Sequence, residues 1–353
     1  MVTDSIKNNL DDWVREVIKY HFSNETGSEF WLKKQKELGI DAINEIKTYS
    51  DLKKLGFFNE DELNNCNVID LIPKKYLHLK EKIKVFETGG TKGNPKRIID
   101  YSYRKSGAKW LNKILDLHKF PSSGNWLHIG PTGPHSIGYT ISLLAGMRKG
   151  ICYYIDFDPR WVKKIITKDQ DMFDLYIDHI CDQSLNILET QQIDFVFTTP
   201  KLLETIWYKL ELNKYNLKGI LSGGTTIHRD LNRIFRTEVL KRVPLAFIYG
   251  NSLMGSAPQS IYCHDELWDL VFYPNYPYFI LEVVDFDDPE TLVEYETRGW
   301  IKITSLNKDF FIPNLLERDE GIRMRGNDIF PWDGVAEVRP HENQLNRIIE
   351  GIY

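Results

Sequence analysis

The sequence predicts an α/β fold in which a mostly parallel sheet lies between helices and is followed by a β-rich region. Four short apolar segments predict buried strands, at 126–129, 151–155, 195–197 and 245–248. The stretches between them, such as 136–149 and 158–189, have the length and apolar periodicity of helices. Buried strands that alternate with helices are typical of parallel sheets, whose ligands bind beyond the carboxyl ends of the strands.

Two further regions flank this part of the chain. The first 85 residues predict a helical layer, because apolar residues recur at helical spacing around Trp13 and again up to Leu38, where Gly39 ends the pattern. Beyond about residue 265, alternation of apolar and polar residues predicts antiparallel strands at 267–272, 278–284 and 300–303. We find no repeat or low-complexity linker, so the expected domain boundary is a short turn near 319–321.

Composition excludes several classes of protein. The net charge is −5 and the 45 Lys and Arg residues are scattered, which argues against a nucleic-acid partner. No apolar run approaches the roughly 20 residues of a membrane span, and the N-terminus does not resemble a secretory signal, so a cytoplasmic location is expected. The cysteines lack C-x-x-C spacing, which predicts neither a metal site nor a disulfide framework. The four cysteines are Cys66, Cys152, Cys181 and Cys263.

Residues 88–96, with the sequence T-G-G-T-K-G-N-P-K, have the composition of a phosphate-binding loop. Glycines let backbone N–H groups converge on an anion, threonine hydroxyls add donors, and lysine supplies positive charge. The spacing excludes a Walker loop, and a G-x-G-x-x-G dinucleotide turn is absent. A plain hairpin turn rich in Gly, Asn and Pro is the structural alternative.

This loop resembles the T-S-G-T-T-G-x-P-K loop of the adenylate-forming superfamily, which contains acyl-CoA synthetases, adenylation domains of peptide synthetases and luciferases. Residues 222–227 resemble its S-G-G-E-P-L turn, residues 249–252 resemble the start of Y-G-x-T-E, and residues 313–319 occupy the place of its ribose-binding aspartate. Residues 30–55 and 325–331 resemble the phenylacetate–CoA ligase branch. The short chain resembles the compact acid-activating proteins of phenazine antibiotic biosynthesis.

The resemblance implies a large adenylation domain over residues 1–319. It would contain a helical layer at 1–85, α/β sheets at 86–265 and a β-rich subdomain at 266–319. Residues 320–353 would be a short remnant of the superfamily's C-terminal domain, with most of that domain missing. Since that domain supplies a catalytic lysine and a thioester-forming face in relatives, thioester formation with CoA is the least favoured outcome.

The same resemblance implies ATP as cofactor, accompanied by Mg²⁺, and gives roles to individual residues. Lys96 would neutralise the departing pyrophosphate, and His135 would hydrogen-bond the attacking carboxylate. The implied nucleotide-binding residues are Thr88, Gly89, Gly90, Thr91, Gly93, Gly223, Gly224, Tyr249, Gly250, Ser252 and Asp319. The residues expected to line the acyl pocket are Trp126, His128, Phe247 and Met254. For all of these, a structural role in the core, at a helix start or on the surface is the alternative.

One departure from the pattern bears on the metal. Leu253 stands where Y-G-x-T-E has the glutamate that ligates Mg²⁺, so the ligand set is open and no metal-ligating residue is predicted. The leading hypothesis is activation of an aromatic carboxylic acid, such as a phenazine carboxylate, as its adenylate, followed by transfer to a reductase, a carrier or an acceptor. The alternatives are a catalytically impaired module that binds an aromatic acid or nucleotide, and a full aryl- or acyl-CoA ligase.

Overall fold

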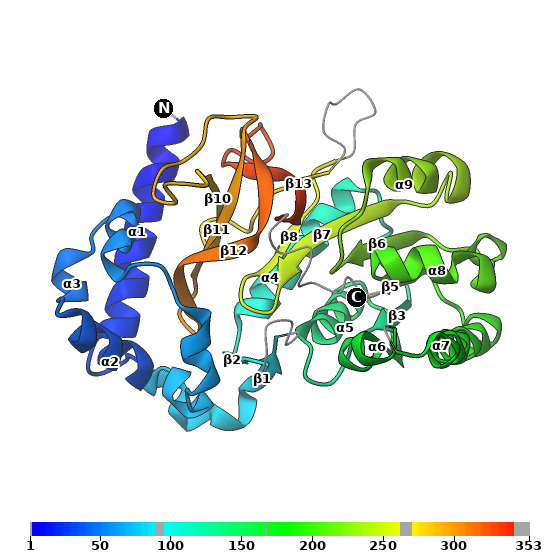
Figure 1. Cartoon of the computed structure of the whole chain (residues 1–353), viewed down its shortest axis with the longest axis horizontal. Helices are drawn as coiled ribbons and strands as arrows, with labels where there is room; N and C mark the ends of the chain where they lie inside the picture. Colours follow the sequence, from blue (N-terminus) through cyan, green and yellow to red (C-terminus); the bar gives the residue numbers. More distant parts are fainter. Residues whose placement is uncertain (1, 89–94, 167, 262–269, 342–353) are drawn as a thin grey trace. The chain divides into compact units, whose positions relative to one another are not determined.

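The computed structural model describes residues 2–88, 95–166, 168–261 and 270–341 (Figure 1). The chain divides into two compact units. The first contains Met1–Arg104, Asn251–Gly255 and Tyr273–His341. The second contains Lys105–Gly250 and Ser256–Phe272. These boundaries differ from the predicted segments, because neither unit is continuous in sequence.

The N-terminal part of the first unit consists of helices, as its periodicity predicts. They are α1 (Val2–Phe22), α2 (Glu29–Leu38), α3 (Ala42–Glu45) and the 3₁₀ helices η1 (Tyr49–Leu55), η2 (Glu60–Asn64), η3 (Val68–Leu71) and η4 (Lys74–Lys82). The Ser28 side chain accepts from the Trp31 N–H at the start of α2, and Gly39 ends that helix in the left-handed conformation, with φ of 66°. Val14, Val17 and Ile18 form the buried face of α1.

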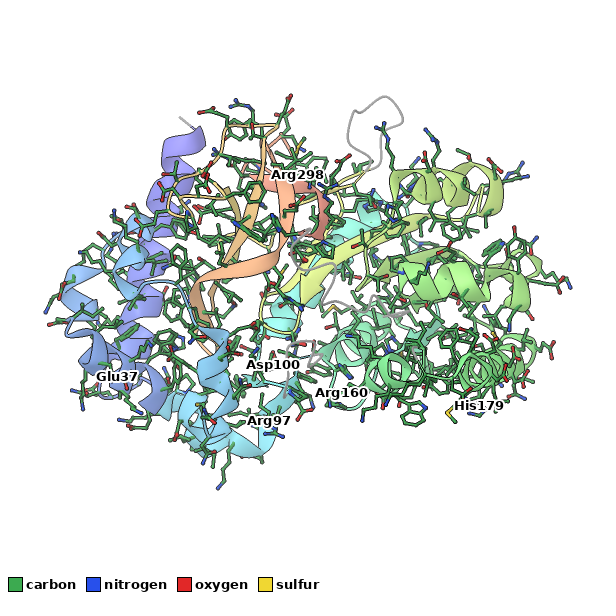
Figure 2. All side chains as sticks on the ribbon, in the orientation of Figure 1. Glu37, Arg97, Asp100, Arg160, His179 and Arg298 are labelled. Atoms are coloured by element: carbon green, nitrogen blue, oxygen red, sulfur yellow. The ribbon has the colours of Figure 1, made fainter. Side chains whose placement is uncertain are left out.

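An antiparallel hairpin follows these helices. Strands β1 (Lys84–Glu87) and β2 (Arg97–Asp100) pair with Lys84 opposite Asp100 and Glu87 opposite Arg97. The glycine-rich segment 88–96 is therefore the connection of a hairpin. Figure 2 labels Arg97 and Asp100, the first and last residues of β2. Helix α4 (Tyr103–Leu117) begins directly after the hairpin.

The β-rich part of the first unit is an antiparallel sheet with the order β10-β11-β12-β13. Its strands are β10 (Phe279–Val284), β11 (Arg298–Leu306), β12 (Phe311–Met324) and β13 (Gly334–Pro340). The boundary expected at Asp319 falls inside β12, where Asp319 pairs with Pro340. Residues 320–340 are thus part of the same sheet as residues 279–319 and do not begin a separate domain.

The second unit contains the predicted parallel sheet. Its strands, in spatial order, are β4 (Cys152–Asp156), β3 (Trp126–Gly130), β5 (Phe195–Thr198), β6 (Gly219–Gly223), β7 (Leu245–Asn251) and β8 (Gly255–Pro258). The first five pair in parallel, which confirms the predicted fold class. Strands β3, β4, β5 and β7 correspond to the four apolar segments of the sequence, whereas β6 was not predicted.

Helices cover this sheet, as expected for a parallel arrangement. They are α5 (Ser136–Met147), α6 (Pro159–Ile165), α7 (Gln170–Thr190), α8 (Pro200–Leu210), η5 (Leu212–Lys214), α9 (Arg229–Ile234) and the π-helical turn η6 (Phe235–Val239). The residues of the second unit also include the short strand β9 (Val271–Phe272). Helix α5 packs against β3 and β4, and α7 packs against β4 (Figure 1). Within the described residues, no helix is long and apolar enough to cross a membrane.

Aromatic residues form much of the core of the second unit. Trp126 is fully buried, and its ring lies 4.9 Å from that of Phe195, in a cluster that also contains Leu144 and Phe197. Phe247 is buried as well, on the adjoining strand β7. The expectation that Trp126 and Phe247 line an acyl pocket is therefore wrong, since both side chains belong to the packed interior.

Candidate functional site

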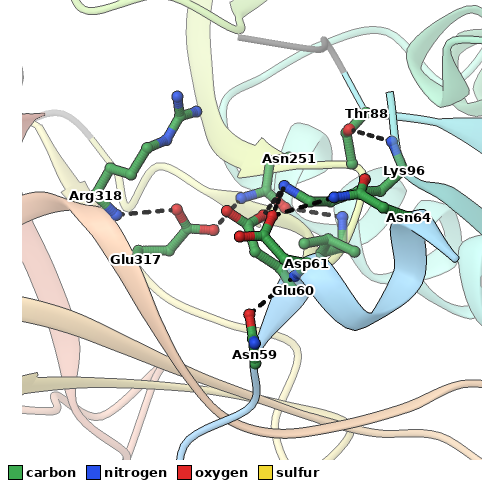
Figure 3. Close-up of polar contacts among 10 residues, drawn as sticks. Asn59, Glu60, Asp61, Asn64, Thr88, Lys96, Asn251, Glu317 and Arg318 are labelled. Carbon is green, nitrogen blue, oxygen red and sulfur yellow. Dashed lines mark hydrogen bonds and ion pairs between the residues drawn. The ribbon is translucent and has the colours of Figure 1, made fainter. Parts of the chain in front are cut away.

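The glycine-rich loop is closed at its base by two hydrogen bonds. The Thr88 N–H donates to the Lys96 carbonyl over 2.9 Å, and the Lys96 N–H donates to the Thr88 hydroxyl over 3.0 Å (Figure 3). Both ends of the loop are thus fixed to each other and to the hairpin. The remaining predicted phosphate-binding residues of the loop, Gly89, Gly90, Thr91 and Gly93, lie outside the described part of the chain.

The Lys96 side chain points back toward the helical layer. Its ammonium lies 3.2 Å from a Glu60 carboxylate oxygen and 3.3 Å from one of Asp61, both in the first turn of η2 (Figure 3). The Lys96 side chain is 7% exposed, against 28% for Glu60 and 69% for Asp61. The predicted catalytic ammonium is therefore paired with two carboxylates that the sequence analysis did not single out.

Ser252 lies at the base of the same hairpin. Its hydroxyl donates to the carbonyl of Glu87, the residue before Thr88, over 3.1 Å. Its own carbonyl accepts from the Tyr103 hydroxyl over 3.2 Å and from the Arg104 guanidinium. The structure thereby brings Ser252, Thr88 and Lys96 together, although they come from distant parts of the sequence.

Asn251 shapes the turn that carries Ser252. Its side-chain oxygen accepts from the N–H groups of Leu253 and Met254, over 2.8 and 3.0 Å, and its amide group donates to the Glu317 carboxylate (Figure 3). This is an Asx turn, in which an asparagine side chain replaces backbone partners. Leu253 and Met254 are 3% and 2% exposed, so both pack in the interior and Met254 does not line an open pocket.

The packing of Leu253 bears directly on the metal. An apolar buried side chain stands where the superfamily motif has a carboxylate, and it offers no oxygen ligand. Across the described ranges, no group of three or more His, Cys, Asp or Glu side chains is arranged to hold a metal ion.

Glu317 is a functional candidate that the sequence analysis missed. It lies in β12 two residues before Asp319, and side chains at this spacing share one face of a strand. Burial, together with the negative charge of Asp319, raises the pKa of Glu317 to about 7, and Arg318 opposes the shift. The two carboxylates at strand spacing were visible in the sequence, but the contact with Asn251 was not.

In the second unit, the loop before α5 carries His135. This residue is 8% exposed, occupies the position before the first turn of α5, and donates from its N–H to the Thr132 carbonyl over 3.1 Å. Asp156, at the end of β4, accepts from the Thr132 N–H over 2.9 Å and also from its hydroxyl. The His135 loop is therefore anchored at the carboxyl ends of the parallel strands.

The buried His128 ring contacts the same loop through the Pro131 carbonyl. Its Nε2 lies 3.0 Å from the Pro131 carbonyl, and its ring stacks on Phe197 at 5.1 Å between centroids. Burial lowers the pKa of His128 to about 4, so the ring is neutral at physiological pH. Because its side chain is fully buried, His128 is a structural residue and does not line an acyl pocket as expected.

The remaining predicted residues of this unit lie at strand ends. Gly223 ends β6, where a Cβ atom would approach Ile248 to 2.4 Å, and Gly224 has a φ of 104°, which favours glycine. Tyr249 and Gly250 lie in β7, and both are partly exposed. The Tyr249 ring lies 6.0 Å from that of Phe272. Packing against Ile248 therefore explains why a glycine stands at position 223, and the positive φ explains the glycine at position 224, without any ligand.

The fold of this chain is similar to that of solved structures of a CoA ligase. The open conformation of 2-hydroxyisobutyryl-CoA ligase, in complex with 2-HIB-AMP and CoA, matches with a TM-score of 0.66 over 94% of this chain and 73% of that chain, at 13% identity. The same ligase in the postadenylation state with 2-HIB-AMP matches with a TM-score of 0.67 over 97% of this chain and 69% of that chain, at 14% identity. No protein-family model and no curated protein matches the sequence. At such low identity the likeness establishes the fold.

Proposed function

We propose that this protein activates a carboxylic acid with ATP. A carboxylate oxygen attacks the α-phosphorus, the bond from that phosphorus to the β-phosphate oxygen breaks, and an acyl adenylate and pyrophosphate form. The observation that supports this most strongly is the closed Thr88–Lys96 loop with Ser252 bonded to its base, on the fold of ligases solved with an acyl-AMP.

Within this proposal the residues predicted to bind ATP and to act in catalysis keep defined roles, whereas the buried residues expected in the acyl pocket do not. The phosphates are held through N–H and hydroxyl donors of Thr88, Gly89, Gly90, Thr91 and Gly93, and Lys96 stabilises the negative charge of the departing pyrophosphate. Asp319 binds the ribose hydroxyls, Tyr249 next to Gly250 lies against the adenine, and the turn with Gly223 and Gly224 lies along the nucleotide and the acyl group. His135 hydrogen-bonds the acid. Each role is a prediction from the resemblance that single substitutions can test.

Mg²⁺ is expected to arrive with ATP and would lower the repulsion between the phosphates and the incoming carboxylate. The buried Leu253 does not fit the role of a ligand. We propose that phosphate oxygens, water and the Ser252 hydroxyl hold the ion, since Mg²⁺ commonly retains several waters and few protein ligands.

The proposed substrate is an aromatic acid, such as a phenazine carboxylate, and the acyl group passes to a reductase, a carrier protein or an amine-bearing acceptor. The 13% aromatic content and the resemblance to acid-activating proteins support this choice. The test is exchange of labelled pyrophosphate into ATP with benzoate, phenylacetate, phenazine-1-carboxylate and, as an aliphatic control, 2-hydroxyisobutyrate. Aromatic acids should stimulate exchange. Failure of every acid contradicts adenylation.

A binding module without turnover is the second candidate, because Leu253 fills the position of the metal-ligating carboxylate with a buried apolar side chain. Calorimetry separates the two functions: a module binds the acid or ATP without forming AMP or pyrophosphate. A full CoA ligase is favoured only by the CoA-bound structure that shares the fold. Mass spectrometry after addition of CoA would detect its thioester.

A further inference from the structure

We propose that Glu60 and Asp61 form a latch that holds the Lys96 ammonium in a resting position until the phosphates of ATP displace them. This inference rests on the proposed function, because it takes the 88–96 loop as the site that receives ATP. It adds two positioning residues from the helical layer, outside every motif of the sequence.

The first argument is geometric. The backbone of Lys96 is fixed by reciprocal hydrogen bonds with Thr88, so only its side chain can change partners while the hairpin stays intact. That side chain is directed to Glu60 and Asp61, over 3.2 and 3.3 Å (Figure 3). An ammonium has three donors and can move between acceptors by rotation of its flexible stem.

The second argument concerns charge. Both carboxylates pair with the single Lys96 ammonium. The negative charges of a triphosphate would be repelled by these carboxylates and attracted by the ammonium. Lys96 can serve as counter-ion for the phosphates only by leaving the carboxylates, so the two acids compete with ATP for the same ammonium.

The third argument is exposure. Asp61 is 69% exposed and Glu60 is 28% exposed, so water can hydrate both carboxylates again when Lys96 leaves. The neighbouring Glu62 pairs with a different lysine, Lys34 of α2, at 2.6 Å. Helix η2 thus uses Glu62 to attach to α2 and directs its first two acids to Lys96.

The test compares the affinity of the full chain for ATP, measured by calorimetry with Mg²⁺ present, among Glu60→Gln, Asp61→Asn and the double variant. Glu62→Gln is the matched control, because it removes the same charge from the same helix without touching Lys96. We expect the double variant to lower the Kd for ATP about 2- to 10-fold, as competing, partly exposed ion pairs predict, and Glu62→Gln to change it less. With Lys96→Met added, the gain should disappear.

The outcomes separate the latch from the function on which it rests. If the unchanged protein binds no ATP, both are wrong. If it binds ATP but the neutralised variants do not bind more tightly, or tighten equally in the Lys96→Met background, only the latch is wrong. Circular dichroism reports folding of each variant, and the single variants carry the test if the double variant unfolds.

Discussion

The side-chain amide of Asn251 donates a hydrogen bond to the carboxylate of Glu317, which joins the turn after β7 to the middle of β12. The same asparagine accepts from the N–H groups of Leu253 and Met254, so it shapes the turn that carries Ser252. Glu317, whose pKa is raised to about 7, therefore contacts Asn251, which shapes the turn at the base of the glycine-rich loop.

Glu317 should make stability depend on pH. Its folded-state pKa of about 7 exceeds the ordinary value of 4.5, so its contribution is complete below about pH 4.5 and is lost as pH rises through 7. Glu317→Gln cannot ionise and still accepts from Asn251. We expect it to match the unchanged protein near pH 4.5 and to be more stable at pH 8, by up to about 3 kcal/mol.

Urea unfolding at the two pH values measures this difference. Glu37→Gln, on α2 (Figure 2), serves as control because the Glu37 carboxylate is exposed and pairs with the exposed Lys33. A Glu317→Gln variant with the same pH dependence as the unchanged protein would show that the carboxylate is not held in its protonated form.

Leu253→Glu should restore the motif but not the metal site. The side chain is 3% exposed, so a carboxylate there loses hydration without gaining a partner, and we expect a loss of roughly 3 kcal/mol or more. Leu253→Met keeps volume and polarity and should cost less than about 1.5 kcal/mol. Thermal unfolding with and without Mg²⁺ is the measurement. Stabilisation of Leu253→Glu by Mg²⁺ would contradict this account.

Asp309 should be a large contributor to the stability of the first unit. It is 2% exposed, and one carboxylate oxygen accepts from the N–H groups of Tyr101, Ser102 and Tyr103, at the start of α4. Asp309→Ala leaves the buried Tyr103 N–H and the two part-buried N–H groups without that acceptor, and we expect a loss of about 2–4 kcal/mol in urea unfolding. The exposed cap Asp169→Ala, on α7, should cost only about 1 kcal/mol. Equal losses of stability in Asp309→Ala and Asp169→Ala would contradict this prediction.

His135→Ala tests the proposed role of that side chain in catalysis. If it hydrogen-bonds the attacking acid, the rate of pyrophosphate exchange should fall about 100-fold, while the Kd for ATP stays within about twofold. His179→Ala, on α7 (Figure 2), is the control because His179 lies on a helix that carries none of the predicted residues. A variant that loses ATP binding to the same extent as exchange points to a structural role for His135.

The sequence revealed the parallel strands because each is a continuous apolar segment between helices. It did not reveal β12, since Glu317 to Glu320 form a charged run that is typical of a surface turn. In the structure, Glu320 is buried and its charge is met by Arg298 and Arg339, over 3.4 and 2.7 Å. Charge pairing across strands thus allows Glu320 to be buried within a polar segment, and no local sequence pattern indicates its partners.

In the candidate site, too, local sequence patterns could be predicted, whereas contacts between distant residues could not. The loop could be predicted because glycine, hydroxyl and lysine chemistry is concentrated in nine adjacent residues, 88–96. The partners of Lys96 could not, because Glu60 and Asp61 lie in a short polar 3₁₀ helix whose acids resemble an ordinary solvated surface. Leu253 was visible as a departure, but only its burial shows that the position belongs to the core.

Exchange of labelled pyrophosphate into ATP, compared between the unchanged protein and Lys96→Ala, tests the central claim most directly. With an aromatic acid present, the unchanged protein should catalyse exchange. Lys96→Ala should reduce it by roughly 10- to 100-fold, as loss of a charge-assisted contact to phosphate predicts. Lys34→Ala, which removes the neighbouring ion pair to η2, is the matched control and should retain exchange. Absence of exchange with every acid, or equal exchange by Lys96→Ala, would contradict the account.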